Sequence, residues 1–302
     1  MRTIQLSLDE RREELKKYRE ENSRRSDEII EHWENGVRDN IDSIGDEQWM
    51  VLEQVCVAAM DNYRPDIVDQ TLVRLLDKFG VDSLRVRRLF AMQHEMREEW
   101  TEALEILNTI IEGDESNSSA RKRKVAIYRA QGDNSKAITE LTKYLKIFMS
   151  DQEAWQELMD LYISEQDYHK ASFCCEELLL HNPHNHLYHT RNGDIRYTIG
   201  GFEQLEIAKQ FYSQAVKMAP SSMRALYGLI LTSGQLAANP KCPQPKRKEH
   251  AKVAFWTSKQ ISARYGNVGS NRHRGLALKQ DRELPLVIEN MLSQLEIAKA
   301  VM

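Results

Sequence analysis

Small, aromatic and proline residues recur along this chain at a fixed interval, and that interval limits the possible folds. In "DQEAWQELMDLYISEQDYHKASFCCEELLLHNP" (residues 151–183), Trp155, Leu158 and Tyr162 are three and four residues apart and share one face of a helix. The stretch predicts two helices, 152–164 and 168–181, joined by "EQD". Pro183 ends the second helix because proline lacks a backbone donor.

The same pattern returns 34 residues earlier and 34 residues before that. Ala171 is matched by Ala137 and Ala103, and Gln166 is matched by Gly132 and Gly200. Three units, starting near 84, 118 and 152, are therefore in register. In a fourth unit the second helix comes three residues late, which we attribute to an insertion in the hairpin. After this delay, Ala208, Tyr212, Ala215 and Pro220 repeat the spacing of Ala171, Cys175, Leu178 and Pro183.

A helical hairpin repeated at this period resembles the tetratricopeptide-repeat family. The resemblance implies an all-α fold, a tetratricopeptide-repeat superhelix (α-solenoid) with flanking N- and C-terminal helices. The chain departs from the family pattern at Met159, where a small residue is usual, and at Arg87 and Arg121, which occupy the tryptophan position.

The pattern also predicts the organisation of the chain. A charged helical segment over 1–45, with Ser7 and Glu10 as a capping box, precedes the solenoid at 46–239. We expect repeat units near 46–80, 84–117, 118–151, 152–185 and 186–222, with another starting at 223. A proline-rich basic loop (240–250) and C-terminal helices (251–302) follow, with a flexible stretch at 266–275 and a closing apolar stripe at Ile288, Met291, Leu292, Leu295 and Ala298.

Composition argues against several classes of protein. The formal net charge is −4, so bulk attraction to nucleic acid is not expected. The N-terminus has no apolar signal core, and no run is long enough to span a bilayer. The sequence contains no phosphate loop, nucleophile elbow or carboxylate pair, so we predict no enzyme, no catalytic or cofactor-binding residues and no cofactor.

Three groups of residues could carry chemistry but have simpler explanations. His181, His184, His186 and His189 cross a turn between repeats without the spacing of a metal site, so no metal is expected. Cys174 and Cys175 are expected to be core thiols, and the four cysteines fit no disulfide framework. The basic strings at 120–124 and 245–252 are expected to be solvated or partner-facing, although the second could approach anionic headgroups.

Repeat solenoids bind partners in a groove lined by the first helix of each hairpin; these are called the first helices, and the others the second helices. The residues expected to point outward there include Arg85, Arg88, Lys122, Arg129, Gln156, Asp160, Asp194 and Tyr197. We expect Arg88, Lys122 and Arg129 to form a basic strip with no part in the packing of the repeats. Two asparagines and the third-unit lysine of a chaperone-tail clamp are missing, since Ala126, Glu157 and Leu187 occupy their places, so binding of chaperone tails is not expected.

Longer strings are more specific. "YREENSRRSDEII" (18–30), "ARKRKVAIYRAQGDNSKAI" (120–138), "NPHNHLY" (182–188) and "YTIGGFEQLEIAKQFYSQAVKM" (197–218) resemble a family of repeat subunits of the endoplasmic reticulum membrane protein complex. The resemblance implies a non-catalytic scaffold, peripheral on the cytoplasmic face of that membrane. Its partners would be membrane-embedded and soluble subunits of an insertase for tail-anchored and multi-spanning proteins. The alternative is a soluble repeat adaptor or cochaperone tied to no membrane complex.

Overall fold

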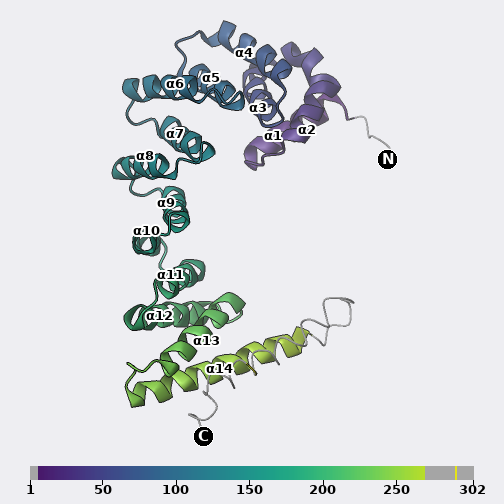
Figure 1. Ribbon diagram of the computed structural model, residues 1–302. Coiled ribbons are helices and arrows are strands. Elements are labelled where there is room, and N and C mark those ends of the chain that lie inside the picture. Colours follow the sequence, from purple (N-terminus) through teal and green to yellow (C-terminus); the bar gives the residue numbers. More distant parts are fainter. Residues whose placement is uncertain (1–5, 269–289, 291–302) are drawn as a thin grey trace. The chain divides into compact units, whose positions relative to one another are not determined.

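The computed structural model describes residues 6–268 and residue 290, and the elements it assigns over this part of the chain are all helical (Figure 1). The predicted all-α solenoid is therefore confirmed. The chain divides into two compact units, Met1–Ile147 and Phe148–Met302. The helices of the first unit are α1 (Leu8–Glu20), α2 (Ser26–His32), η1 (Trp33–Val37), η2 (Arg38–Glu47), α3 (Gln48–Asp61), α4 (Pro65–Phe79), α5 (Leu84–Met96), α6 (Trp100–Gly113), α7 (Ser118–Ala130) and α8 (Asn134–Ile147). Those of the second are α9 (Gln152–Ser164), α10 (Tyr168–His181), α11 (His186–Ile199), α12 (Phe202–Met218), α13 (Met223–Ala238) and α14 (Gln244–Val268).

Consecutive helices pair as hairpins, and the four hairpins from α5 to α12 turn at the same place in the repeat. The turns contain Glu98, Gly132, Gln166 and Gly200, all with φ between 60° and 76°. Glu98 and Gln166 adopt this left-handed backbone although it usually favours glycine. In the hairpins of α5 to α10, a backbone N–H one residue later closes the turn, for example Asp167 N to Tyr162 O at 2.9 Å. This Schellman-type bond satisfies a carbonyl at the end of the first helix.

The starts of the first helices are also in register. The side chains of Asn117, Asp151 and Asn185 accept hydrogen bonds from the backbone N–H groups of Ala120, Ala154 and Leu187. Each N-cap therefore satisfies a donor that has no partner inside the helix. Asp151 and the helix after it match the boundaries predicted from the sequence for α9.

Fully buried alanines recur on the second helices of the hairpins. Ala103, Ala137, Ala171 and Ala208, on the second helices α6, α8, α10 and α12, are completely buried. A methyl side chain lets the two helices of a hairpin approach at these points, and large neighbours such as Leu107, Leu141 and Leu178 fill the space beside them. The 34-residue spacing of Ala103, Ala137 and Ala171 thus places a small buried residue at the same point of three hairpins, and Ala208 follows 37 residues later.

The fourth predicted unit corrects one expectation. We expected its three extra residues in the hairpin turn, but the turn is short and holds Gly200 and Gly201, both with positive φ. The helix α12 begins 34 residues after α10 and runs for 17 residues instead of 14. The extra residues therefore lengthen the helix, because "FEQLEIAKQ" contains no residue that breaks a helix.

The N-terminal helices belong to the core of the first unit. The predicted capping box is present, since Ser7 N donates to Glu10 Oε2 at 2.7 Å and Glu10 N donates to Ser7 Oγ at 3.3 Å. Leu15, Ile30 and Trp33 pack into the same buried cluster as the apolar residues of α3 and α4. The segment therefore packs against the first hairpin.

The prediction of a basic loop at 240–250 is wrong for most of these residues, because α14 begins at Gln244. The break between α13 and α14 ends at Pro243, and Pro245 is the second residue of α14. Proline is tolerated there because the N–H groups of a first helical turn have no helical partner. Of the predicted flexible stretch at 266–275, residues 266–268 lie in α14. The remainder of that stretch and the stripe Ile288, Met291, Leu292, Leu295 and Ala298 lie outside the described residues.

Candidate functional site

The predicted groove residues lie on first helices, but several are already engaged inside the fold. In the first unit, Glu53 on α3 accepts from both Arg85 and Arg88 on α5, the latter at 2.8 Å. On the next pair of first helices, Arg123 donates to Glu95 at 3.0 Å. The expectation that Arg88 has no part in the packing of the repeats is therefore wrong, because Arg88 links two neighbouring hairpins.

The second unit repeats this arrangement with aspartates. Asp160 on α9 accepts from Arg191 on α11 at 2.9 Å. Asp194 on α11 accepts from Arg224 on α13 at 2.7 Å. Two of the predicted partner-binding residues, Asp160 and Asp194, are thus carboxylate ends of bonds between successive first helices.

The other predicted groove residues differ in their engagement. Lys122 lies over the ring of Tyr144, with its Nζ 5.7 Å from the ring centre, so it too takes part in packing. Tyr197 Oη accepts from Gln235 Nε2 at 2.7 Å. Arg129 and Gln156 are exposed on α7 and α9. The proposed basic strip is therefore partly neutralised, and its role as a binding surface stays a prediction.

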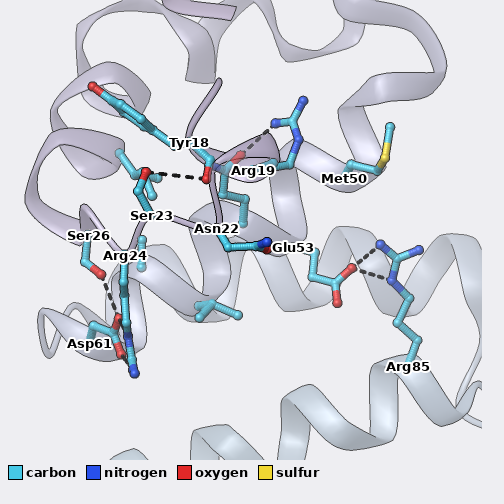
Figure 2. A pocket seen from close by; sticks show the side chains of 14 residues that line it. Tyr18, Arg19, Asn22, Ser23, Arg24, Ser26, Met50, Glu53, Asp61 and Arg85 are labelled. Atoms are coloured by element: carbon cyan, nitrogen blue, oxygen red, sulfur yellow. Dashed lines mark hydrogen bonds and ion pairs between the residues drawn. The ribbon is translucent and has the colours of Figure 1, made fainter. Parts of the chain in front are cut away.

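A hollow of about 460 Å³ opens in the first unit where α1 and α2 meet α3 (Figure 2). Ile29, Met50, Val57 and Ala58 supply its apolar lining. Tyr18 and a ring of polar residues complete the lining, namely Arg19, Asn22, Ser23, Arg24, Ser26, Glu53, Gln54, Asp61 and Arg85. Such a lining suits an apolar side chain of a partner flanked by polar groups.

Most charges around this hollow are held in place by their neighbours. Figure 2 shows Arg24 and Ser26 converging on Asp61, with Arg24 Nε donating to Asp61 Oδ2 at 2.8 Å. The Arg24 guanidinium lowers the pKa of Asp61. Arg19 Nη1 donates to the amide oxygen of Gln54 at 2.6 Å, and burial lowers the pKa of Arg19.

A second hollow of about 430 Å³ shares the Glu53–Arg85 pair with the first. Leu84 and Arg88 line it together with Asn117 and Ser119 at the start of α7. Met50 and Leu84, one in each hollow, are exposed apolar residues on first helices. The first-helix surface of this unit is therefore a pair of depressions separated by an ion pair.

The histidines near the start of α11 form no metal centre in the structure. His181 and His184 are exposed, and His189 Nε2 lies 2.9 Å from the Pro183 carbonyl oxygen. Throughout the part of the chain that the structure describes, no group of three or more His, Cys, Asp or Glu side chains is arranged to hold a metal ion.

The cysteines and the basic string on α7 have structural roles. Cys174 and Cys175 are buried, and burial raises the pKa of each thiol to about 12. On α7, Arg123 bonds Glu95 and Lys124 lies 3.3 Å from Glu140. The charges of residues 120–124 therefore spread around the helix and contact several neighbours, as expected for a helical segment.

Sequence reasoning missed the inter-repeat ion pairs and the hollow. The pairs carry a signal, since acids and arginines recur 28 to 35 residues apart, as in Asp160 with Arg191 and Asp194 with Arg224. No pattern in the sequence signals the hollow, because the hollow depends on how α1 and α2 pack on α3.

Comparison with known proteins places these features in a family. Residues 71–206 match the family described as the EMC2 TPR-like repeat domain. The chain is 42% identical over 296 residues to ER membrane protein complex subunit 2-A of Xenopus laevis, covering 98% of this chain and 97% of that protein. It is 35% identical over 197 residues to ER membrane protein complex subunit 2 of Dictyostelium discoideum, covering 62% and 61% of the two chains.

Solved structures agree on the fold. The C-terminal part of a TPR repeat-containing protein from Cytophaga hutchinsonii aligns with a TM-score of 0.55, covering 85% of this chain and 98% of that one. The two are 13% identical, so this likeness concerns the fold alone.

Proposed function

Because this chain belongs to the family of subunit 2 of the ER membrane protein complex, we propose that it is a non-catalytic scaffold subunit at the cytoplasmic face of the endoplasmic reticulum membrane. Its first helices bind cytosolic segments of membrane-embedded subunits, and the chain also holds soluble subunits. Through these contacts it supports the insertion of tail-anchored and multi-spanning proteins.

The observation that carries this proposal is the extent of the similarity. The 42% identity to the Xenopus laevis subunit covers 98% of this chain, so it includes the helices that flank the repeats as well as the repeats. A shared repeat pattern alone would give similarity over the hairpins only. The described part of the chain also offers no helix that could serve as a membrane span.

The form of the first-helix surface supports a binding role. Met50, Leu84 and Leu187 are large apolar residues that α3, α5 and α11 leave exposed. None of the three is among the buried residues that form the hairpin cores. Apolar side chains beside paired charges are typical of surfaces that bind protein segments.

Affinity purification of the tagged chain in mild detergent, followed by mass spectrometry, tests the proposal. Membrane-embedded subunits of the complex should be recovered in near-equal amounts with the chain. Recovery of water-soluble partners alone, with no membrane subunit, would mean that the chain is an adaptor or cochaperone and that the proposal is wrong.

Membrane fractionation tests the peripheral placement. The chain should sediment with membranes and be released by alkaline carbonate, because it is held through partner subunits. A chain that stays in the bilayer after carbonate extraction would contradict a peripheral scaffold.

A further inference from the structure

The helix α14 presents an outer face whose composition is unusual for a solvated surface. Its inner face is buried on the second unit through Ala251, Ala254 and Ile261, which belong to the core cluster of that unit. The outer face carries Lys248, Lys252, Phe255, Trp256 and Lys259, all exposed. Phe255 and Trp256 each expose nearly half of their surface, 44% and 48%.

These five residues form one stripe. Their spacing repeats every three or four residues, so by the helical period they fall within an arc of roughly 120° and a length of about 16 Å. Lys259 Nζ lies 4.4 Å from the centre of the Phe255 ring, so its ammonium sits beside the aromatic group. Two lysines therefore precede the two aromatic side chains along this exposed face, and a third lysine follows them.

The charge of the stripe is positive. Among the described residues, no carboxylate forms an ion pair with Lys248, Lys252 or Lys259. Glu249, at the edge of the arc, lies 3.7 Å from Lys209 on α12, so its charge is directed away from the stripe. Within the described part of the chain, three lysines thus stand beside two aromatic rings with no carboxylate in an ion pair with them.

We propose that this outer face of α14 binds the anionic headgroup surface of a lipid bilayer, with Phe255 and Trp256 entering the interface and the three lysines contacting lipid phosphates and carboxylates. Tryptophan and phenylalanine favour the boundary between headgroups and acyl chains, and lysines gain from the negative surface potential. The helix would lie along the surface. This contact goes beyond the proposed scaffold role, which requires no lipid.

Co-sedimentation of the purified full-length chain with vesicles tests the proposal. Binding to phosphatidylcholine vesicles containing phosphatidylserine should exceed binding to pure phosphatidylcholine vesicles, and high salt should weaken it. At about fivefold per lysine, the variant K248Q/K252Q/K259Q should bind up to about a hundredfold more weakly. A matched variant, K16Q/K17Q/K146Q, removes three exposed lysines elsewhere and should bind much better than the stripe variant.

The aromatic residues separate a lipid from another acidic partner. Trp256→Gln should also weaken vesicle binding severalfold, and the tryptophan emission of the wild-type chain should shift to the blue on binding, with the shift lost in Trp256→Phe. If lysine removal abolishes binding while Trp256→Gln leaves it unchanged, the face responds to charge alone, as it would to an acidic protein, and the proposal is wrong.

Two further outcomes would overturn the proposal. One is equal vesicle binding by the stripe variant and the matched variant. The other is protection of Trp256 from a soluble quencher in the free chain, which would mean that another part of the chain or a second copy covers the face. These outcomes are independent of the recovery of complex subunits in detergent, so this inference and the proposed function can fail separately.

Discussion

The ring of Tyr212 on α12 packs against Gly228 on α13 so closely that a Cβ at Gly228 would lie 2.2 Å from Tyr212 Cε1. A Cβ at Gly193 on α11 would lie 2.8 Å from Cε1 of the same ring. Tyr212 Oη donates to Asp194 at 2.6 Å, and Asp194 also accepts from Arg224. One buried tyrosine therefore joins three helices of the second unit.

Gly228→Ala should destabilise the protein. The added methyl collides with a buried ring, and overpacking of this kind costs about 1–3 kcal/mol. The gain in helix propensity, about 1 kcal/mol, offsets only part of this. The thermal midpoint should fall. Gly113→Ala, where a Cβ would meet nothing within 4 Å, is the matched control and should leave the midpoint equal or higher. A raised midpoint for Gly228→Ala would contradict the close packing of Tyr212.

Ala171→Leu tests the crossing between α9 and α10. Ala171 has no exposed surface, so the larger side chain should overpack the hairpin and cost about 1–3 kcal/mol of unfolding free energy. Ala126→Leu on the exposed side of α7 is the control and should cost far less. Urea denaturation of both variants measures the difference. Equal midpoints for the two variants would mean that Ala171 is not at a close crossing.

Stability should decrease as pH falls below neutrality, in part through His32. Burial, and then Arg11, whose Nη1 lies 3.4 Å from His32 Nδ1, lowers the pKa of this imidazole. Protonation therefore favours the unfolded chain, whose histidines titrate near about 6.5. The contribution of neutral His32 is present above that value and is lost as pH falls toward the folded pKa. In His32→Gln, the thermal midpoint should depend less on pH between pH 7 and 5 than it does in the wild type. His181→Gln, at an exposed histidine, should leave this pH dependence unchanged. Equal slopes of thermal midpoint against pH for the wild type and His32→Gln would refute the contribution of His32.

The cysteines should be inert in the folded chain. All four are buried, and burial raises the pKa of Cys56 to about 11 and those of Cys174 and Cys175 to about 12. Thiol reagents act on the thiolate, so the native protein should react slowly at neutral pH. Labelling should appear only across the urea unfolding transition. Stoichiometric labelling before that transition would contradict buried structural thiols.

The register of the repeats could be predicted because its causes are local. The buried alanines, such as Ala171, the turn at Gln166 and the N-cap Asp151 each act within a few residues and recur with the repeat. These signals placed α9 and α10 correctly. They could not place the extra residues of α12, since both a longer turn and a longer helix preserve the later spacing.

Proline gave a misleading signal at α14. A cluster of prolines near 240–245 suggested a loop, yet Pro245 lies in the first helical turn, where its missing donor costs nothing. The effect of a proline depends on its position in the helix, and that position is fixed by where α14 packs against α13.

The helices that carry the predicted groove residues could be predicted, but the partners of these side chains could not. Repeat offsets correctly placed Arg88 and Asp160 on first helices. They did not reveal that Glu53 and Arg191 stand opposite on neighbouring helices, because such pairs depend on the stagger between hairpins. Charges at these positions pair with neighbouring helices, so changing them would affect the stack of hairpins as well as partner binding. Exposed apolar residues are therefore better probes of binding.

Quantitative co-purification of membrane-embedded subunits with two triple variants tests the central claim most directly. M50E/L84E/L187E changes exposed apolar residues of the first helices α3, α5 and α11, and V73E/I147E/L180E changes apolar residues of the second helices α4, α8 and α10 that are at least as exposed. Both variants should keep the helical circular dichroism of the wild type. The first should lose the membrane subunits at least tenfold, and the second should recover them at the wild-type level. Full recovery with the first-helix variant, or loss with the second-helix variant alone, would contradict a scaffold that binds its partners through the first helices.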